Sequence, residues 1–182
     1  NGLAGVARKL PATGRNANLK RHTISRMKNN GLKILGKPRL LIIGCGDVGL
    51  RLLPMLRKRF HIFAVTSQPA RCAELRAAGA TPVVANLDQR DSLYRLKGLA
   101  DTIVHLAPPP SEGKQDRRTR NLAAILPRHG TVVYISTTGV YGDCGGAIFD
   151  ETRTVSPVNA RALRRVDAEQ VLRRWALRMN GR

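Results

Sequence analysis

Residues 40–49 read Leu40-Leu41-Ile42-Ile43-Gly44-Cys45-Gly46-Asp47-Val48-Gly49, an apolar run that passes directly into three closely spaced glycines. The apolar run is too short for a helix and is typical of a strand that is buried on both faces. The residues that follow it, up to Arg59, carry leucines at helical spacing. The stretch therefore predicts a buried strand, a glycine turn and an amphipathic helix in direct succession.

A glycine turn in this position can hold a phosphate. Gly44 permits the tight turn, Gly46 lets a ligand approach the backbone without a Cβ in the way, and Gly49 lets the helix pack on the strand. The phosphate would meet free N–H groups and the positive end of the helix dipole. We therefore expect a dinucleotide pyrophosphate to lie on Gly44, Cys45, Gly46, Asp47, Val48 and Gly49. The alternative is that the glycines serve only the turn.

Strands and helices alternate along the rest of the chain. The pattern predicts further strands at His61–Val65, Thr81–Ala85, Thr102–Leu106 and Thr131–Ser136. It predicts helices at Asp47–Arg59, Ala70–Ala78 and Ser92–Lys97, another that ends before Pro127, and a last one at about Ala160–Arg178. Such alternation with short connections implies right-handed crossovers and helices on both faces of a parallel sheet. The fold class is therefore α/β, the N-terminal part of a Rossmann-type doubly wound sheet with about five strands, over residues 39–178.

The N-terminal residues differ in composition from this domain. Residues 1–46 hold ten Lys or Arg and no acid, within a chain of net charge +20. Residues 1–38 also lack apolar periodicity, which predicts a basic, disordered tail. Met27 is a plausible start, in which case residues 1–26 would not be native sequence. We expect the basic charge to be mainly a solvated surface; the alternative is that it binds nucleic acid.

Composition restricts the class of protein. No apolar run approaches the length of a membrane span, and the N-terminus lacks the apolar core of a signal peptide, so we expect a soluble cytoplasmic protein. The three cysteines, Cys45, Cys72 and Cys144, are far apart and are expected to be reduced thiols. The four histidines are equally scattered, so no metal site is expected.

The second predicted strand bears on the choice of cofactor. A ribose with a free 2′-hydroxyl is usually held by an acid about 20 residues after the glycines, but Thr66 and Ser67 stand there and Arg71 follows. An arginine suits a 2′-phosphate, which favours NADP over NAD; the alternative is that Arg71 is a solvated surface residue. Asp88, after the third strand, is interpreted as an acceptor for the adenine amino group, or as a capping or surface residue. After the fourth strand, Leu106, Ala107 and Pro108 would form a wall beside the nucleotide.

Several segments together resemble a known family. The glycine turn, Val104-His105-Leu106-Ala107, and Ser136-Thr137-Thr138-Gly139-Val140-Tyr141-Gly142 with Asp150-Glu151 beyond it are similar to the NAD-dependent epimerase/dehydratase family. These proteins are the extended and atypical short-chain dehydrogenases. The resemblance covers residues 39–175, the nucleotide-binding part of a family whose members are usually longer. It implies NAD(P)-dependent chemistry on a hydroxyl or carbonyl substrate, such as a nucleotide-sugar.

The resemblance also implies roles for particular residues. Thr137 matches the hydroxyl residue that polarises the substrate carbonyl; the alternative is that its hydroxyl only caps the turn after the strand. The family's Tyr-x-x-x-Lys pair is replaced, however, by Arg161 and Arg165. An arginine stays protonated near neutrality and cannot transfer protons, so both are interpreted as substrate-side clamps for a phosphate or carboxylate. Tyr141 is the candidate substitute phenol, if an arginine lies beside it.

Three functions remain open on the sequence alone. The first is an epimerase-like oxidoreductase, and the second is a non-catalytic protein that senses the dinucleotide. The third is a nucleic-acid-binding protein that uses the basic tail. Because the chain stops where a sixth strand is expected, we also expect it to be a truncated form without its substrate lobe, and thus an enzyme whose activity is uncertain. The oligomeric state is not predicted.

Overall fold

The computed structural model describes residues 36–179 and Gly181. The expected tail, residues 1–38, lies almost entirely outside these residues and stays a prediction. Strands and α-helices alternate as β1 (Arg39–Ile43), α1 (Asp47–Leu56), β2 (His61–Thr66), α2 (Cys72–Ala77), β3 (Thr81–Val84), β4 (Thr102–His105), α3 (Arg117–Ala123), β5 (Thr131–Tyr134) and α4 (Ala160–Met179). Three 3₁₀ helices lie between them: η1 (Pro69–Arg71), η2 (Arg90–Leu96) and η3 (Thr138–Tyr141).

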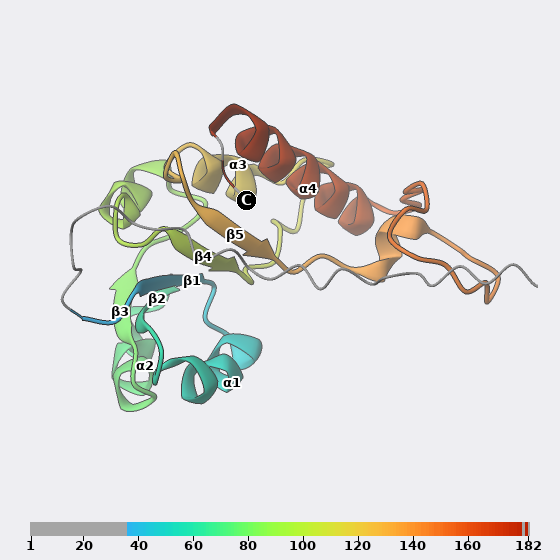
Figure 1. Cartoon of the computed structure of the whole chain (residues 1–182). Coiled ribbons are helices and arrows are strands. Elements are labelled where there is room, and N and C mark those ends of the chain that lie inside the picture. The colour runs from blue at the N-terminus through green and yellow to red at the C-terminus, as the bar shows by residue number, and fades with distance from the viewer. Residues whose placement is uncertain (1–35, 180, 182) are drawn as a thin grey trace, which may run out of the picture. The chain divides into compact units, whose positions relative to one another are not determined.

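The five strands form one parallel sheet in the order β3-β2-β1-β4-β5. The order of the strands reverses at β1: β2 and β3 lie on one side of it, and β4 and β5 lie on the other (Figure 1). The predicted Rossmann-type α/β fold is confirmed. This reversal opens a crevice at the carboxyl ends of the strands, which is where open α/β sheets bind ligands.

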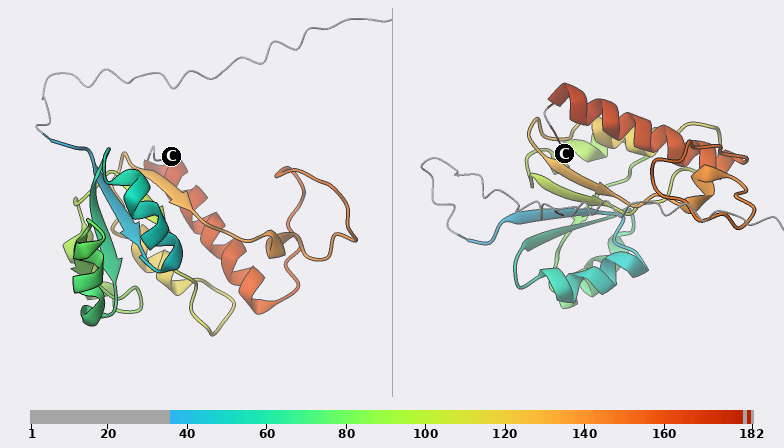
Figure 2. Two further views of the ribbon diagram at one scale, coloured as in Figure 1. Left: turned by 90° about the horizontal axis from the view of Figure 1, so that it is seen from below. Right: turned by 45° about the vertical axis from the view of Figure 1, so that its right-hand side comes forward.

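Helices cover both faces of the sheet. Helices α1 and α2 lie on one face, and α3 and α4 lie on the other (Figures 1 and 2). Because side chains alternate along a strand, Leu40 and Ile42 of β1 pack towards α1 while Leu41 and Ile43 pack towards α3. All four are at most 2% exposed, as expected for a strand buried on both faces. The apolar run at residues 40–43 thus joins the two cores.

Some element boundaries differ from the prediction. Helix α1 ends at Leu56 instead of Arg59, and β5 ends at Tyr134 instead of Ser136. The helix expected at Ser92–Lys97 is the 3₁₀ helix η2. The Ser92 hydroxyl lies close to the backbone carbonyls of Asn86 and Gln89 and accepts from the Asn86 N–H. These local bonds stabilise a tight turn in place of a regular α-helix.

Strand β5 is one of the two edges of the sheet in the described part of the chain, and β3 is the other. Val133 is 48% exposed and the following Ile135 is 50% exposed. The sheet is therefore less completely covered here than at β1. None of the helices within residues 36–179 is long and apolar enough to cross a membrane.

Candidate dinucleotide site

A pocket of about 400 Å³ lies at the carboxyl ends of the strands, at the reversal beside β1. Twelve of the thirteen residues expected from sequence to contact a cofactor line it, and the exception is Asp88. The twelve are Gly44, Cys45, Gly46, Asp47, Val48, Gly49, Thr66, Ser67, Arg71, Leu106, Ala107 and Pro108. The other lining residues are Ile43, Val65, Gln68, Ala85, Asn86, Leu87 and Arg118.

The glycine turn shapes the floor of the pocket. Gly44 has a φ of +79°, and a Cβ on it would lie 2.6 Å from the Cα of Ala107. Gly46 has a φ of −84°, and no atom of the described chain lies within 4 Å of the place its Cβ would take. Gly44 is therefore required by backbone conformation and packing. Gly46 instead leaves open space on the pocket side.

Helix α1 begins at this open space. Its N-cap is Gly46, and no side chain of the described residues caps it. The first N–H groups of a helix have no partner within the helix, so those of the first turn of α1 are available to a ligand. The carboxylate of Asp47 is turned to Arg51, at 3.0 Å, with 76% of its side chain exposed. The helix end is thus free to bind an anion.

Cys45 is the buried residue of the glycine turn. Its side chain is 2% exposed, and a Cβ on Gly49 would lie only 2.8 Å from its Sγ. Gly49 therefore allows α1 to pack directly against this thiol. Burial raises the pKa of the Cys45 thiol above its usual value, although nearby Arg71 opposes the shift. A packing role for Cys45 follows from its neutral, buried state.

Arg71 closes the pocket beside the end of β2. Its Nη1 donates to the carbonyl oxygen of Cys45 at 2.8 Å, and its Nε donates to Glu74 at 2.9 Å. The side chain is 27% exposed, so the cation is accessible from the pocket. Thr66 ends β2 beside it, and its hydroxyl accepts from the Gln68 N–H at 3.1 Å. This end of the pocket therefore carries a cation and a hydroxyl.

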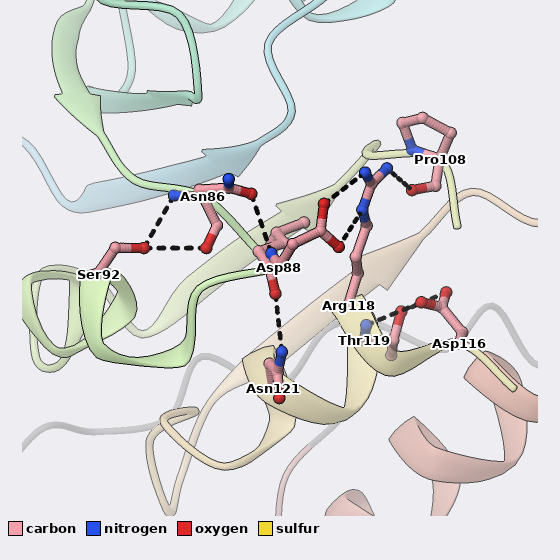
Figure 3. A network of polar contacts seen from close by, with 9 residues as sticks. Asn86, Asp88, Ser92, Pro108, Asp116, Arg118, Thr119 and Asn121 are labelled. Carbon is pink, nitrogen blue, oxygen red and sulfur yellow. Dashed lines mark hydrogen bonds and ion pairs between the residues drawn. The ribbon is translucent and has the colours of Figure 1, made fainter. Parts of the chain in front are cut away.

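Asp88 does not line the pocket but supports a residue that does. Both of its carboxylate oxygens accept from Arg118, at 2.9 Å from Nε and 2.6 Å from Nη2 (Figure 3). This hydrogen bond lowers the pKa of the Asp88 carboxyl below its usual value. Asn86 and Leu87 line the pocket at this position instead. The interpretation of Asp88 as an adenine acceptor stays a prediction.

The proposed catalytic residues lie beyond β5 and outside the lining of this pocket. Thr137 precedes η3, and its hydroxyl accepts from the Gly139 N–H at 3.3 Å. Tyr141 ends η3 and packs edge-on against Phe149, with ring centroids 5.0 Å apart. Both side chains are partly buried. Thr137 thus caps a turn, which leaves its assignment as a substrate contact a prediction.

The two arginines that replace Tyr-x-x-x-Lys have different surroundings. Arg161, on the first turn of α4, is exposed. Arg165 is 8% exposed, and its Nη1 donates to the Tyr134 hydroxyl at 3.0 Å and to the Ile135 carbonyl at 2.9 Å. Burial raises the pKa of Tyr134, while this hydrogen bond opposes the shift. The phenol beside Arg165 is therefore that of Tyr134 and not that of Tyr141.

Seven lining residues were missed in the sequence analysis, and Asn86 and Arg118 are two of them. Asn86 directly follows β3, and the rule that ligands bind at the carboxyl ends of parallel strands would have indicated it. Arg118 comes from α3, and no sequence spacing connects it to the glycine turn. No group of three His, Cys, Asp or Glu residues in the described part of the chain is arranged to hold a metal ion. Cys45, Cys72 and Cys144 are free thiols.

Comparison with known proteins finds a similar domain for the region around the glycine turn. Residues 40–107 match the model of the TrkA-N domain, a Rossmann domain that binds NAD. A conserved protein of unknown function from Silicibacter pomeroyi is 30% identical, with a TM-score of 0.60, over 75% of this chain and 48% of that one. No curated protein is similar enough to match.

Two further solved structures hold NAD. UDP-glucuronic acid 4-epimerase from Bacillus cereus in complex with NAD is 21% identical, with a TM-score of 0.61, over 78% of this chain and 53% of that one. A short-chain dehydrogenase/reductase superfamily protein from Agrobacterium tumefaciens with bound NAD is 19% identical, with a TM-score of 0.59, over 74% and 44%. The resemblance to epimerases and short-chain dehydrogenases is confirmed for the fold. The chain spans about half the length of these structures.

Proposed function

We propose that the protein binds NADP or NAD in the pocket beside β1 and acts as an epimerase-like oxidoreductase on a hydroxyl or carbonyl substrate. One observation carries the proposal: the uncapped N-terminus of α1 opens at Gly46 onto a pocket of about 400 Å³. A pyrophosphate there would accept from the free N–H groups of α1 and be stabilised by the helix dipole. The dinucleotide supplies hydride transfer when bound.

Thermal unfolding in the presence of each dinucleotide tests the binding step. A ligand at a hundredfold its dissociation constant should stabilise the protein by about 2.7 kcal/mol. We expect the larger increase in melting temperature with NADPH, because Arg71 offers a cation near the end of β2 where an acid would favour NADH. Equal increases in melting temperature with NADPH and with NADH would contradict the preference for NADP. If neither dinucleotide raises the melting temperature, the binding proposal is wrong.

Replacement of Thr137 tests the catalytic step. We expect the protein to oxidise NADPH with a carbonyl substrate, and T137A to lower kcat by about tenfold or more, since a lost oxyanion donor costs a few kcal/mol in other enzymes. T138A is the matched control, because it removes a neighbouring hydroxyl that is not at the matched position. A T137A protein with unchanged kcat would show that the Thr137 hydroxyl only caps the turn.

A second candidate function is a dinucleotide sensor without turnover. The surroundings of Arg165 favour a sensor. This arginine stands where the resemblance implies a catalytic lysine, but its guanidinium is buried and donates to Tyr134 and Ile135. A sensor should bind NADPH yet leave its absorbance at 340 nm constant with every carbonyl substrate in a panel. Turnover with any of them, sensitive to T137A, would exclude this function.

A further inference from the structure

We propose that the guanidinium of Arg118 is the surface on which the adenine ring of the dinucleotide stacks. This inference rests on the proposed dinucleotide binding and assigns a specificity role to a residue outside the glycine turn. Arg118 lies on α3, lines the pocket, and has 28% of its side chain exposed. It faces the same pocket as Asn86 and Leu87 after β3 and Pro108 after β4.

The hydrogen bonds of Arg118 hold its guanidinium in one orientation. Nε and Nη2 donate to the two oxygens of Asp88, and Nη1 donates to the carbonyl of Pro108 at 3.2 Å (Figure 3). All five N–H groups of a guanidinium lie in its plane, so these acceptors occupy its edges. None of these bonds uses a flat face of the guanidinium, and the side chain lines the pocket. A planar cation stacks well on an aromatic ring, and this one is already ordered.

The order of groups in a dinucleotide places the adenine at this end. With the pyrophosphate on Gly46 and the adjoining ribose near the end of β2, the base extends towards Asn86 and Leu87. Arg118 reaches this region from α3 because Asp88 holds it. The Asn121 amide also donates to the Leu87 carbonyl, at 2.8 Å, and ties the loop after β3 to the same helix. Asp88 is thus a positioning residue for the stacking surface.

Affinity measurements on two variants test the assignment. We expect R118A to weaken the binding of NADPH and of ADP by about tenfold each, the size of a desolvated cation–π contact, while inorganic pyrophosphate binds both proteins equally. R118K keeps the charge but loses the planar, bidentate group, so it should lose a similar factor. R117A is the control: it removes a neighbouring, exposed arginine of α3 and should bind like the wild type.

The outcomes separate this inference from the proposed function. If the wild type binds NADPH and R118A binds it equally well, the stacking role is wrong while the cofactor site stands. Full affinity in R118K, or an equal loss of pyrophosphate binding in R118A, would assign Arg118 to the phosphates and overturn the inference. If the wild type binds no dinucleotide, the proposed function itself fails. Circular dichroism of each variant confirms that it is folded.

Discussion

Replacing Gly46 with alanine is expected to abolish tight dinucleotide binding while leaving the fold intact. A Cβ at this position meets no atom of the described residues within 4 Å, and the φ of −84° suits alanine. The fold should lose no more than about 1 kcal/mol, the usual difference between glycine and alanine at an N-cap. The added methyl group would, however, occupy the space where the pyrophosphate approaches the backbone. We expect the dissociation constant for NADPH to rise by at least about tenfold.

Replacing Gly44 should have the opposite balance of effects. Its φ of +79° disfavours alanine, and the new Cβ would lie 2.6 Å from the Cα of Ala107. Strain and overpacking together should lower the free energy of unfolding by about 3 kcal/mol. G98A is the matched control, because Gly98 also has a positive φ of +75° but has open space around it among the described residues. The difference between G44A and G98A gives the cost of the clash.

Urea unfolding and calorimetric titration with NADPH measure both properties on each variant. A G46A protein that binds NADPH like the wild type would mean that the glycines serve only the turn. Unchanged stability in G44A would show that the chain can move away from Ala107 at no cost.

The stability of the protein is expected to fall as the pH is lowered from 6.5 towards 4, because of His105. This side chain is 1% exposed on β4, and burial, assisted by the charge of Arg165, lowers its pKa from 6.5 to about 4. Its Nε2 lies 2.9 Å from the hydroxyl of Thr119, which itself donates to Asp116. The hydroxyl must therefore accept from Nε2–H. With a pKa of about 4 the imidazole is neutral at pH 7, and its Nδ1 has no partner in the described chain.

The sign of this effect on stability follows from the protonation of His105 in the folded and the unfolded chain. Above pH 6.5 the imidazole is neutral in both states, and its contribution does not change with pH. Between pH 6.5 and 4 the unfolded chain binds a proton that the folded chain does not, so unfolding becomes more favourable. The loss from this group between pH 7 and pH 5 should be about 2 kcal/mol.

Comparison with H105Q isolates this contribution from that of the carboxylates. Glutamine does not titrate and can still donate to Thr119. We expect the free energy of unfolding of H105Q to change by about 2 kcal/mol less than that of the wild type between pH 7 and pH 5. Urea unfolding at the two pH values provides the measurement. If the free energy of unfolding changes by the same amount in both proteins between pH 7 and pH 5, His105 is not neutral and buried.

The candidate site was only partly predictable because its residues are specified in two different ways. The glycine turn belongs to one continuous segment, so the spacing of Gly44, Gly46 and Gly49 and the flanking apolar residues predict it locally. Thr66 ends the next strand, Arg71 follows it, and both join the site through the parallel topology. Arg118 is held by Asp88, 30 residues away in sequence. Pairing at this range depends on the packing of α3 over the sheet.

The amino-acid sequence alone was enough to predict the order of strands and helices along the chain and a parallel sheet, and it led to the expectation of a phosphate at the start of α1. These properties depend on side-chain periodicity and on glycine conformation, which are local. The folded structure was needed to find that Arg165 is bonded to Tyr134 instead of Tyr141, that Asp88 supports Arg118, and that His105 is buried and neutral. Such contacts form between distant segments, because hydrogen bonding and burial depend on the neighbours that folding supplies.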